Sequence, residues 1–283
     1  MHAVRSILVI IEPHDAESLA LTRAKLIACV TQAHLHLLIC DKKHDHSLLL
    51  EELTEDLLKA DFNATAQQAW NDSPHQTIID VQQAENCGLV IKQHFPDNPL
   101  KKALLTPDDW KLLRLCPSAV LMVKTATSWN GGVILAAVDV GSSDGEHRAL
   151  HYSIIDHGFE IAALTKGQLH VIAAHPLPML TAADPASHIE ARYREQCLAF
   201  QSEFDVDDSH LHVAEGPADV LIPHTAHILK AAVTIIGTVG RTGLSGALIG
   251  NTAEVILDSV ESDVLVLKTD GVIAHLEALA LKS

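Results

Sequence analysis

The residues best suited to binding a charged ligand lie between positions 235 and 254, in the stretch IIGTVGRTGLSGALIGNTAE. An apolar run ends at Gly237, more glycines follow, and Gly250-Asn251-Thr252 opens a predicted helix. Glycines let backbone N–H groups approach a ligand, and a helix N-terminus adds unpaired donors and partial positive charge. The stretch therefore predicts a phosphate-binding cradle, with Arg241 as its sole basic side chain.

Motifs for other chemistry are missing or weak. The chain has no G-x4-G-K-(S/T) loop and no G-x-G-x2-G after its first predicted strand. Ser245 misses the G-x-S-x-G pattern of an esterase nucleophile by one residue, and no base is suggested for it, so we interpret it as a loop serine. No catalytic residue is assigned.

Histidine is unusually frequent, with 19 residues. His34 and His36 alternate onto one face of a predicted strand, and nearby polar stretches hold His44, His46 and His75. Their spacing matches no closed zinc site. We therefore interpret them as surface and strand-edge histidines and predict no metal ligands.

Composition excludes several classes of protein. The 36 acidic and 20 basic residues give the 283-residue chain a formal charge of −16, which disfavours nucleic acids and anionic membranes as partners. No apolar run approaches the ~20 residues of a membrane helix. The five cysteines are an odd number without a C-x-x-C pair. We expect a cytoplasmic protein with aliphatic cores.

The elements that must position the glycine loop follow a βαβ rhythm, which is typical of buried parallel sheets. The first half has predicted strands at 4–10, 34–40, 63–69, 87–92 and 118–124, and helices at 15–31, 46–60, 74–85 and 106–115. The second half has strands at 132–138, 168–174, 209–215, 233–237 and 263–268, and helices near 144–164, 185–203, 217–231 and 250–259.

The second half repeats the first in detail as well as in order. Leu35-His36-Leu37 corresponds to Leu169-His170-Val171, and AVLMVK ends one half as DVLVLK ends the other. We predict two tandem α/β domains of five parallel strands each, over residues 1–126 and 127–283, joined by the polar stretch 125–132.

On the basis of these motifs and the repeated halves, the chain resembles a tandem-domain universal stress protein. That family has a Rossmann-like, adenine nucleotide alpha hydrolase-like fold and the nucleotide motif G-x2-G-x9-G-(S/T). Gly237, Gly240 and Gly250 match the glycines, and Asn251 followed by Thr252 replaces the usual Ser or Thr. Asparagine can still cap a helix and donate to phosphate.

The resemblance implies further site residues and partners. Asp139 matches an aspartate near the adenosine, and Val213 and Gly216 match a V-x2-G stretch near the adenine. ATP with Mg²⁺ is the implied ligand of residues 127–283. The two halves are expected to form an internal pseudo-dimer, and the resemblance leaves room for a homodimer of chains and for a protein partner that the sequence does not identify.

The first half keeps the predicted fold and loses the motif. Aligning Val90-Ile91 with Ile235-Ile236 places Lys92 at Gly237 and Phe95 at Gly240. Asp72 then falls at Gly216, and Glu12 replaces Asp139. We therefore predict that residues 1–126 form a nucleotide-free partner domain.

Three functions are open at this point. The favoured one is a stress-response module whose C-terminal half binds ATP and regulates packing or partners. A slow Mg²⁺-dependent ATPase is the second, with Asp139 or Glu215 near a metal or water, although phosphoryl transfer with one loop arginine has little charge neutralisation. An interaction scaffold with a vestigial nucleotide site is the third.

Overall fold

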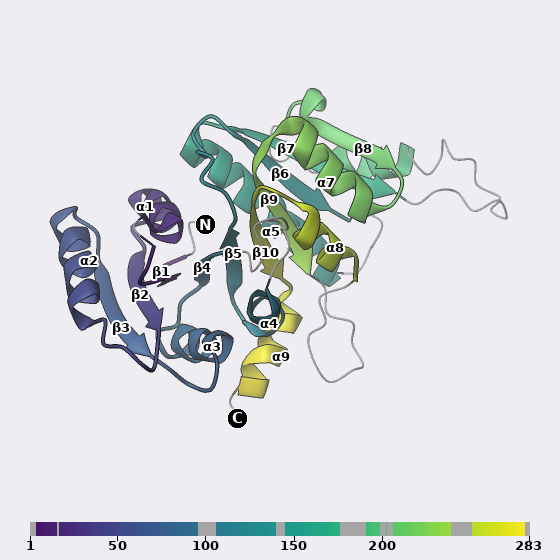
Figure 1. Cartoon of the computed structure of the whole chain (residues 1–283). Helices are drawn as coiled ribbons and strands as arrows, with labels where there is room; N and C mark the ends of the chain where they lie inside the picture. The colour runs from purple at the N-terminus through teal and green to yellow at the C-terminus, as the bar shows by residue number, and fades with distance from the viewer. Residues whose placement is uncertain are drawn as a thin grey trace. The chain divides into compact units, whose positions relative to one another are not determined.

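The computed structural model describes residues 4–15, 17–95, 106–139, 145–175, 191–198, 202, 206–238 and 251–280. Parallel strands alternate with helices throughout these residues (Figure 1). They form two compact units. The first contains the described residues as far as Ala126 and those of the last helix from Ile273 on, and the second contains those between Thr127 and Val272.

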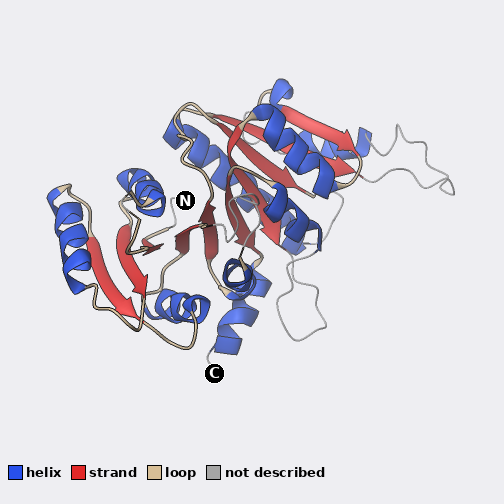
Figure 2. Ribbon diagram, viewed as in Figure 1, coloured by secondary structure: helices blue, strands red, loops and turns tan. Residues whose placement is uncertain are grey.

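The first unit has a five-strand parallel sheet in the order β3-β2-β1-β4-β5. Its strands are β1 (Ser6–Ile10), β2 (His34–Cys40), β3 (Ala64–Ala69), β4 (Leu89–Gln93) and β5 (Ala119–Val123). Its helices are α1 (Leu19–Thr31), α2 (Ser47–Lys59), α3 (Pro74–Ala84) and α4 (Pro107–Leu115). α1 and α2 cover one face of the sheet, and α3 packs beside α4 on the other (Figure 2).

The second unit repeats this arrangement in the order β10-β9-β6-β7-β8. Its strands are β6 (Val133–Val138), β7 (Gln168–His175), β8 (Leu211–Glu215), β9 (Ala231–Thr238) and β10 (Asp263–Lys268). Its helices are α5 (Gly145–Thr165), α7 (Ala218–Leu229) and α8 (Asn251–Ser259), with a 3-10 turn at Asp208–His210 and a helical segment over 191–198. The last helix, α9 (Asp270–Ala280), starts in this unit and belongs to the first unit from Ile273 on.

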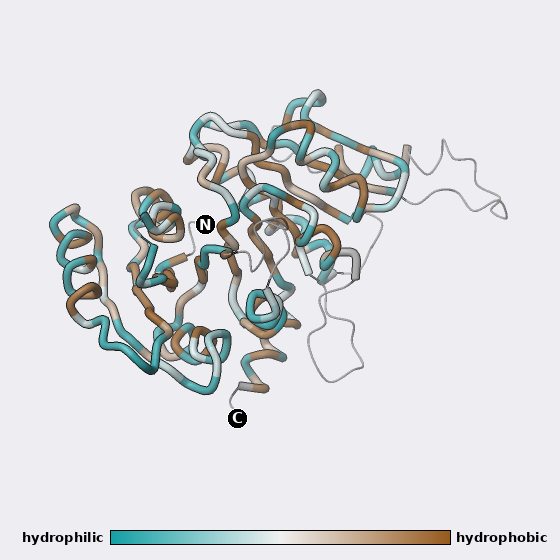
Figure 3. The backbone as a smooth tube through the Cα atoms, viewed as in Figure 1, coloured by the Kyte–Doolittle hydropathy of each residue, from teal (hydrophilic) through white to brown (hydrophobic). Residues whose placement is uncertain are grey.

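Apolar strands form the centre of each unit. Ile7, Leu8 and Val9 of β1 are fully buried, and so are Ile134 and Leu135 of β6. Hydrophobic residues run along the strands of both units, whereas the turns between them are largely hydrophilic (Figure 3). Strands buried on both faces are typical of parallel sheets covered by helices. The predicted fold class of parallel α/β units is confirmed.

The stretch that joins the two halves is largely exposed, but it is anchored near each end. The guanidinium of Arg23 donates to the carbonyl of Thr125, 3.1 Å away, at the end of the first unit. Trp129 is buried in the second unit, and its indole N–H donates to the Asp263 carboxylate over 2.8 Å.

Across the described residues, no helix is both long enough and apolar enough to span a bilayer.

Candidate functional site

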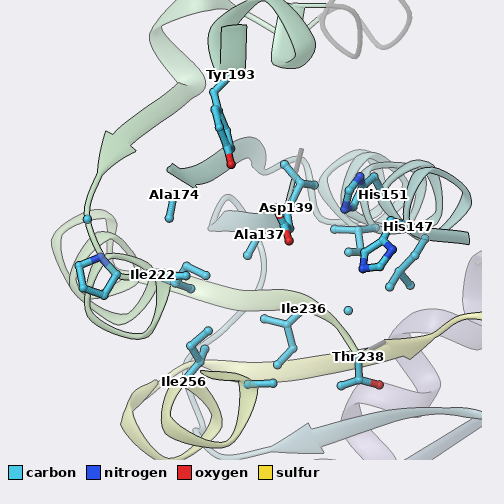
Figure 4. A pocket seen from close by; sticks show the side chains of 18 residues that line it. Ala137, Asp139, His147, His151, Ala174, Tyr193, Ile222, Ile236, Thr238 and Ile256 are labelled. Carbon is cyan, nitrogen blue, oxygen red and sulfur yellow. The ribbon is translucent and has the colours of Figure 1, made fainter. Parts of the chain in front are cut away.

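A pocket of about 690 Å³ lies at the carboxyl ends of three strands of the second unit (Figure 4). Ala137, Val138 and Asp139 reach it from β6, Ala174 from β7, and Ile236, Gly237 and Thr238 from β9. From β6 the chain continues to β7, toward one edge of the sheet, and from β9 it continues to β10, toward the other edge. The strand order therefore reverses between β6 and β9. In open α/β sheets, ligands bind at such a reversal of strand order, outside the carboxyl ends of the strands.

Helices form the remaining walls. The N-terminal halves of α7 and α8, with the cap of α7, contribute Pro217, Ala218, Ile222, Ala253 and Ile256. α5 contributes Leu150 and Ile154. Ala253 lies in the first turn of α8, so the N-terminus of that helix borders the pocket. Unpaired N–H groups at a helix N-terminus favour anions. The pocket thus combines apolar walls with an anion-binding helix end.

Asp139 and Tyr193 both point their polar ends into the pocket (Figure 4). Asp139 follows β6 and is exposed, whereas Tyr193, on the 191–198 segment, is only 6% exposed. Burial and the charge of Asp139 raise the pKa of Tyr193, although Arg192 opposes them. Tyr193 is therefore a neutral phenol, able to donate and accept hydrogen bonds, and its ring packs against His175 with centroids 5.5 Å apart.

Two histidines of α5 line the same pocket. His147 and His151 are one helical turn apart, with ring centroids separated by 6.4 Å, and His151 is buried. Neither histidine nor Tyr193 was expected from the sequence. The i,i+4 spacing of the histidines, at the start of the helix that follows Asp139, was an available signal. No comparable signal marks Tyr193, which lies 54 positions beyond Asp139.

The structure brings three of the predicted site residues together. Asp139, Gly216 and Gly237 all line the pocket. Val213 lies on β8 beside Ala173 of β7 and is not among the described residues that line it. Asn251 and Thr252 begin α8. Gly240, Arg241 and Gly250 lie outside the described residues.

Packing favours glycine at one of these positions and backbone conformation at another. A Cβ at Gly237 would lie 2.6 Å from Cδ2 of Leu150, so a larger residue there would require the Leu150 side chain to shift. Gly216 has a φ of +142°, which side-chain-bearing residues rarely adopt. Both positions therefore favour glycine for the fold itself, whether or not a ligand binds.

The corresponding place in the first unit is filled by charged side chains. Lys92 stands at the end of β4, and its Nζ lies 2.8 Å from Oδ1 of Asp109, near the start of α4. His94 Nδ1 lies 2.9 Å from the other carboxylate oxygen. Asp109 is the third residue of α4, as Ala253 is of α8. The Asp109 carboxylate thus occupies the start of α4, whereas the start of α8, its counterpart in the second unit, borders an open pocket.

Asp109 is ionised despite its burial. Burial raises the pKa of this carboxyl, but the hydrogen bond with His94 and the charge and hydrogen bond of Lys92 outweigh it and hold the pKa well below its usual range. Burial also raises the pKa of Glu12, which follows β1 where Asp139 follows β6. At the carboxyl ends of its strands, the first unit thus has charged side chains that pair with one another, and the second unit has an open pocket.

Comparison with known proteins identifies the family. The family model described as "Universal stress protein family" matches residues 132–268. Universal stress protein E of Salmonella typhi is 33% identical over 231 residues, covering 78% of this chain and 73% of that protein. Universal stress protein E of Escherichia coli K12 is 34% identical over 211 residues, covering 71% and 67%.

Solved structures share the fold. A functionally unknown protein from Pseudomonas aeruginosa PAO1 is 64% identical, with a TM-score of 0.92 over 100% of this chain and 99% of that one. A universal stress protein from Archaeoglobus fulgidus is 16% identical and shares the fold, with a TM-score of 0.62 over 94% of this chain and 99% of that one. The chain belongs to the universal stress protein family and contains two α/β units in tandem.

Proposed function

We propose that this chain binds ATP, as its Mg²⁺ complex, in the pocket of the second unit, and that it serves in the stress response as a nucleotide-dependent regulatory or interaction module. The observation that carries the proposal is the pocket itself. It lies at the reversal of strand order, between Asp139 after β6 and Gly237 on β9, and it extends to the N-terminus of α8. Its volume, about 690 Å³, falls within the range of small-molecule sites.

Each part of the nucleotide has a matching wall. The aliphatic side chains of Ile222, Ile236 and Ile256 suit the flat, apolar base. The Asp139 carboxylate accepts hydrogen bonds from ribose hydroxyls or from the adenine amine. The start of α8 offers backbone N–H groups for the phosphates. The sequence predicts further donors in the glycine-rich segment before it, which lies outside the described residues.

Charge sets the expected affinity. Residues 127–283 carry 8 basic and 20 acidic side chains, a formal charge of −12, which repels a tetra-anion. Mg²⁺ is therefore expected to be required, and a dissociation constant near micromolar, about 8 kcal/mol of binding free energy, is expected.

A matched pair of variants tests the proposal. Asp139→Ala removes the acceptor from the pocket, and Glu12→Ala removes its counterpart in the first unit. In equilibrium dialysis with MgATP, Asp139→Ala is expected to weaken binding about 10- to 100-fold, since hydrogen bonds to charged groups contribute about 1.5–3 kcal/mol. Glu12→Ala is expected to bind as the parent does. Equal affinities for the parent and Asp139→Ala would contradict the proposal.

Two rival functions are separated by simple measurements. A scaffold with a vestigial site would bind no MgATP at millimolar concentration. A slow ATPase would release phosphate from the bound complex, whereas the proposed module releases none within its nucleotide residence time. Phosphate release at a constant rate, lost in Asp139→Ala, would favour the ATPase.

A further inference from the structure

A second cluster of ligating groups lies in the first unit, far along the sequence from the pocket. It occupies the short loop between β2 and α2, where Asp41, His44 and His46 come together. Oδ2 of Asp41 lies 3.0 Å from Nδ1 of His44 and 2.9 Å from Nε2 of His46. Their three ligating atoms all lie within 4.8 Å of one another. Two imidazoles and one carboxylate therefore converge on one point.

This donor set has the chemistry of a zinc-type ion. Imidazole nitrogen and carboxylate oxygen bind Zn²⁺ at about 2.0–2.2 Å, and three protein ligands plus one water complete a tetrahedron. Tetrahedral ligands at that distance are roughly 3.3–3.5 Å apart. The observed separations of 2.9 and 3.0 Å thus need to widen by only a few tenths of an ångström.

The loop is held in this shape by a neighbouring strand. Gln68 of β3 donates from Nε2 to the carbonyls of Asp41, at 3.0 Å, and His44, at 2.6 Å. Its Oε1 accepts the N–H of His46 over 2.8 Å. One side chain therefore fixes the backbone of all three ligand residues. Such outer-shell contacts orient metal ligands and commonly contribute 10- to 100-fold in affinity.

Access also suits a cation. The side chain of His44 is 71% exposed and that of His46 14%, so one ligand can be reached from solvent while the others are anchored.

We propose that Asp41, His44 and His46 form a site for one divalent transition-metal ion of the zinc type, with solvent at the fourth position. The sequence alone left these histidines as surface residues because the spacing of the histidines matches no closed zinc site. The contribution of Gln68, 22 positions after His46, could not be read from that spacing. His46 immediately precedes α2, so bound metal would join the end of β2 to the start of that helix.

The test is a Zn²⁺ titration of the untagged, chelator-stripped chain against a chromophoric competitor. One tight Zn²⁺ site per chain is expected. His44→Gln, His46→Gln and Asp41→Asn should each weaken it at least 10-fold, and Gln68→Ala should weaken it with every ligand still present. His224→Gln and His275→Gln remove exposed histidines from α7 and α9 and should leave the site unchanged.

Folding is checked separately, by thermal unfolding in the presence of chelator. His44→Gln is the decisive variant, because its exposed side chain can be removed without opening the core. Co²⁺ should give the visible absorption of a tetrahedral complex with the parent chain and not with His44→Gln. The proposal is overturned if the parent binds no Zn²⁺ tighter than about 100 μM, or if the α7 and α9 controls lose as much binding as the loop variants.

Discussion

At the scale of single residues, the clearest contrast between the two units is Asp109 against Ala253. Both are the third residue of the helix that follows the fourth strand of their unit. Asp109 is buried and paired with Lys92 and His94, whereas Ala253 lines an open pocket. The helix N-terminus thus meets a carboxylate of the chain itself in the first unit and borders a cavity in the second.

Removal of Asp109 should destabilise the protein strongly. Asp109→Ala leaves the ammonium of Lys92 without its partner, in a site where the lysine side chain is only 13% exposed. Breaking a buried pair in this way costs about 3–5 kcal/mol. Asp108→Ala is the matched control, because this neighbouring carboxylate is 47% exposed and its contact with His75 is expected to contribute less than about 1 kcal/mol. Urea unfolding, followed by tryptophan fluorescence, measures both; similar losses would contradict the assignment.

A histidine cluster in the second unit should make stability depend on pH. Nδ1 of His170 lies 2.9 Å from Nε2 of His212, and the His210 ring is 4.1 Å away between centroids. Burial, then the charges of His210 and His212, lower the pKa of His170 to about 4. Between that value and the ordinary pKa of about 6.5, the unfolded chain binds more protons than the folded one. The free energy of unfolding should therefore fall as the pH drops through this window, by about 3 kcal/mol.

The variant His170→Asn isolates this effect. It removes the group with the lowered pKa, so its unfolding free energy should fall less steeply than that of the parent between pH 6.5 and 4. His224→Gln, an exposed histidine on α7, should keep the slope of the parent. If His170→Asn and the parent give parallel curves, the cluster does not control acid stability.

Three residues predicted from the glycine motif and the family resemblance, Asp139, Gly216 and Gly237, line the pocket. Their role in binding stays a prediction. Tyr193 was not predicted, because a segment distant in sequence returns to the pocket only through the tertiary fold. Gly237 also shows a limit of motif reading, since its close approach to Leu150 favours glycine for packing as well.

At the scale of elements, apolar periodicity predicted nearly every strand and helix. The predicted strands 34–40 and 263–268 are observed with the same bounds. β9 begins at Ala231, earlier than predicted, because a register shift between Val133 and Ile134 of β6 accommodates an additional residue. α1 begins at Leu19 and not at 15, because the Ser18 side chain accepts the Leu21 N–H and caps the helix. Hydropathy does not indicate where a strand pair has a bulge. It also does not indicate which of several polar residues caps a helix.

The predicted start of α4 can be tested through its cap. Thr106 Oγ1 accepts the Asp109 N–H over 3.2 Å, and the Asp109 carboxylate accepts the Thr106 N–H over 3.1 Å. Thr106→Ala removes one half of this capping box and should lower the unfolding free energy by about 1 kcal/mol. Thr106→Ser keeps the hydroxyl and should behave as the parent in urea unfolding. A Ser variant as unstable as the Ala variant would assign the loss to the methyl group, not to the cap.

At the scale of the whole molecule, two units with the same order of strands and helices carry different side chains at the carboxyl ends of their strands. Both sheets have the same strand order relative to their first strand. In the first unit, Lys92, His94 and Asp109 close the carboxyl end with a buried charge network. In the second, glycine and alanine leave about 690 Å³ open. The duplication was visible in the sequence, whereas the charge network was not, because it pairs residues of β4 and α4 that no local pattern connects.

One calorimetric titration with MgATP tests this account most directly. The parent is compared with Ala174→Leu, which fills the pocket from the end of β7, and with Cys40→Leu, the corresponding position at the end of β2. The account predicts one MgATP per chain for the parent and for Cys40→Leu, with affinity reduced at least 10-fold in Ala174→Leu. Two MgATP per chain, or unchanged binding by Ala174→Leu, would contradict it.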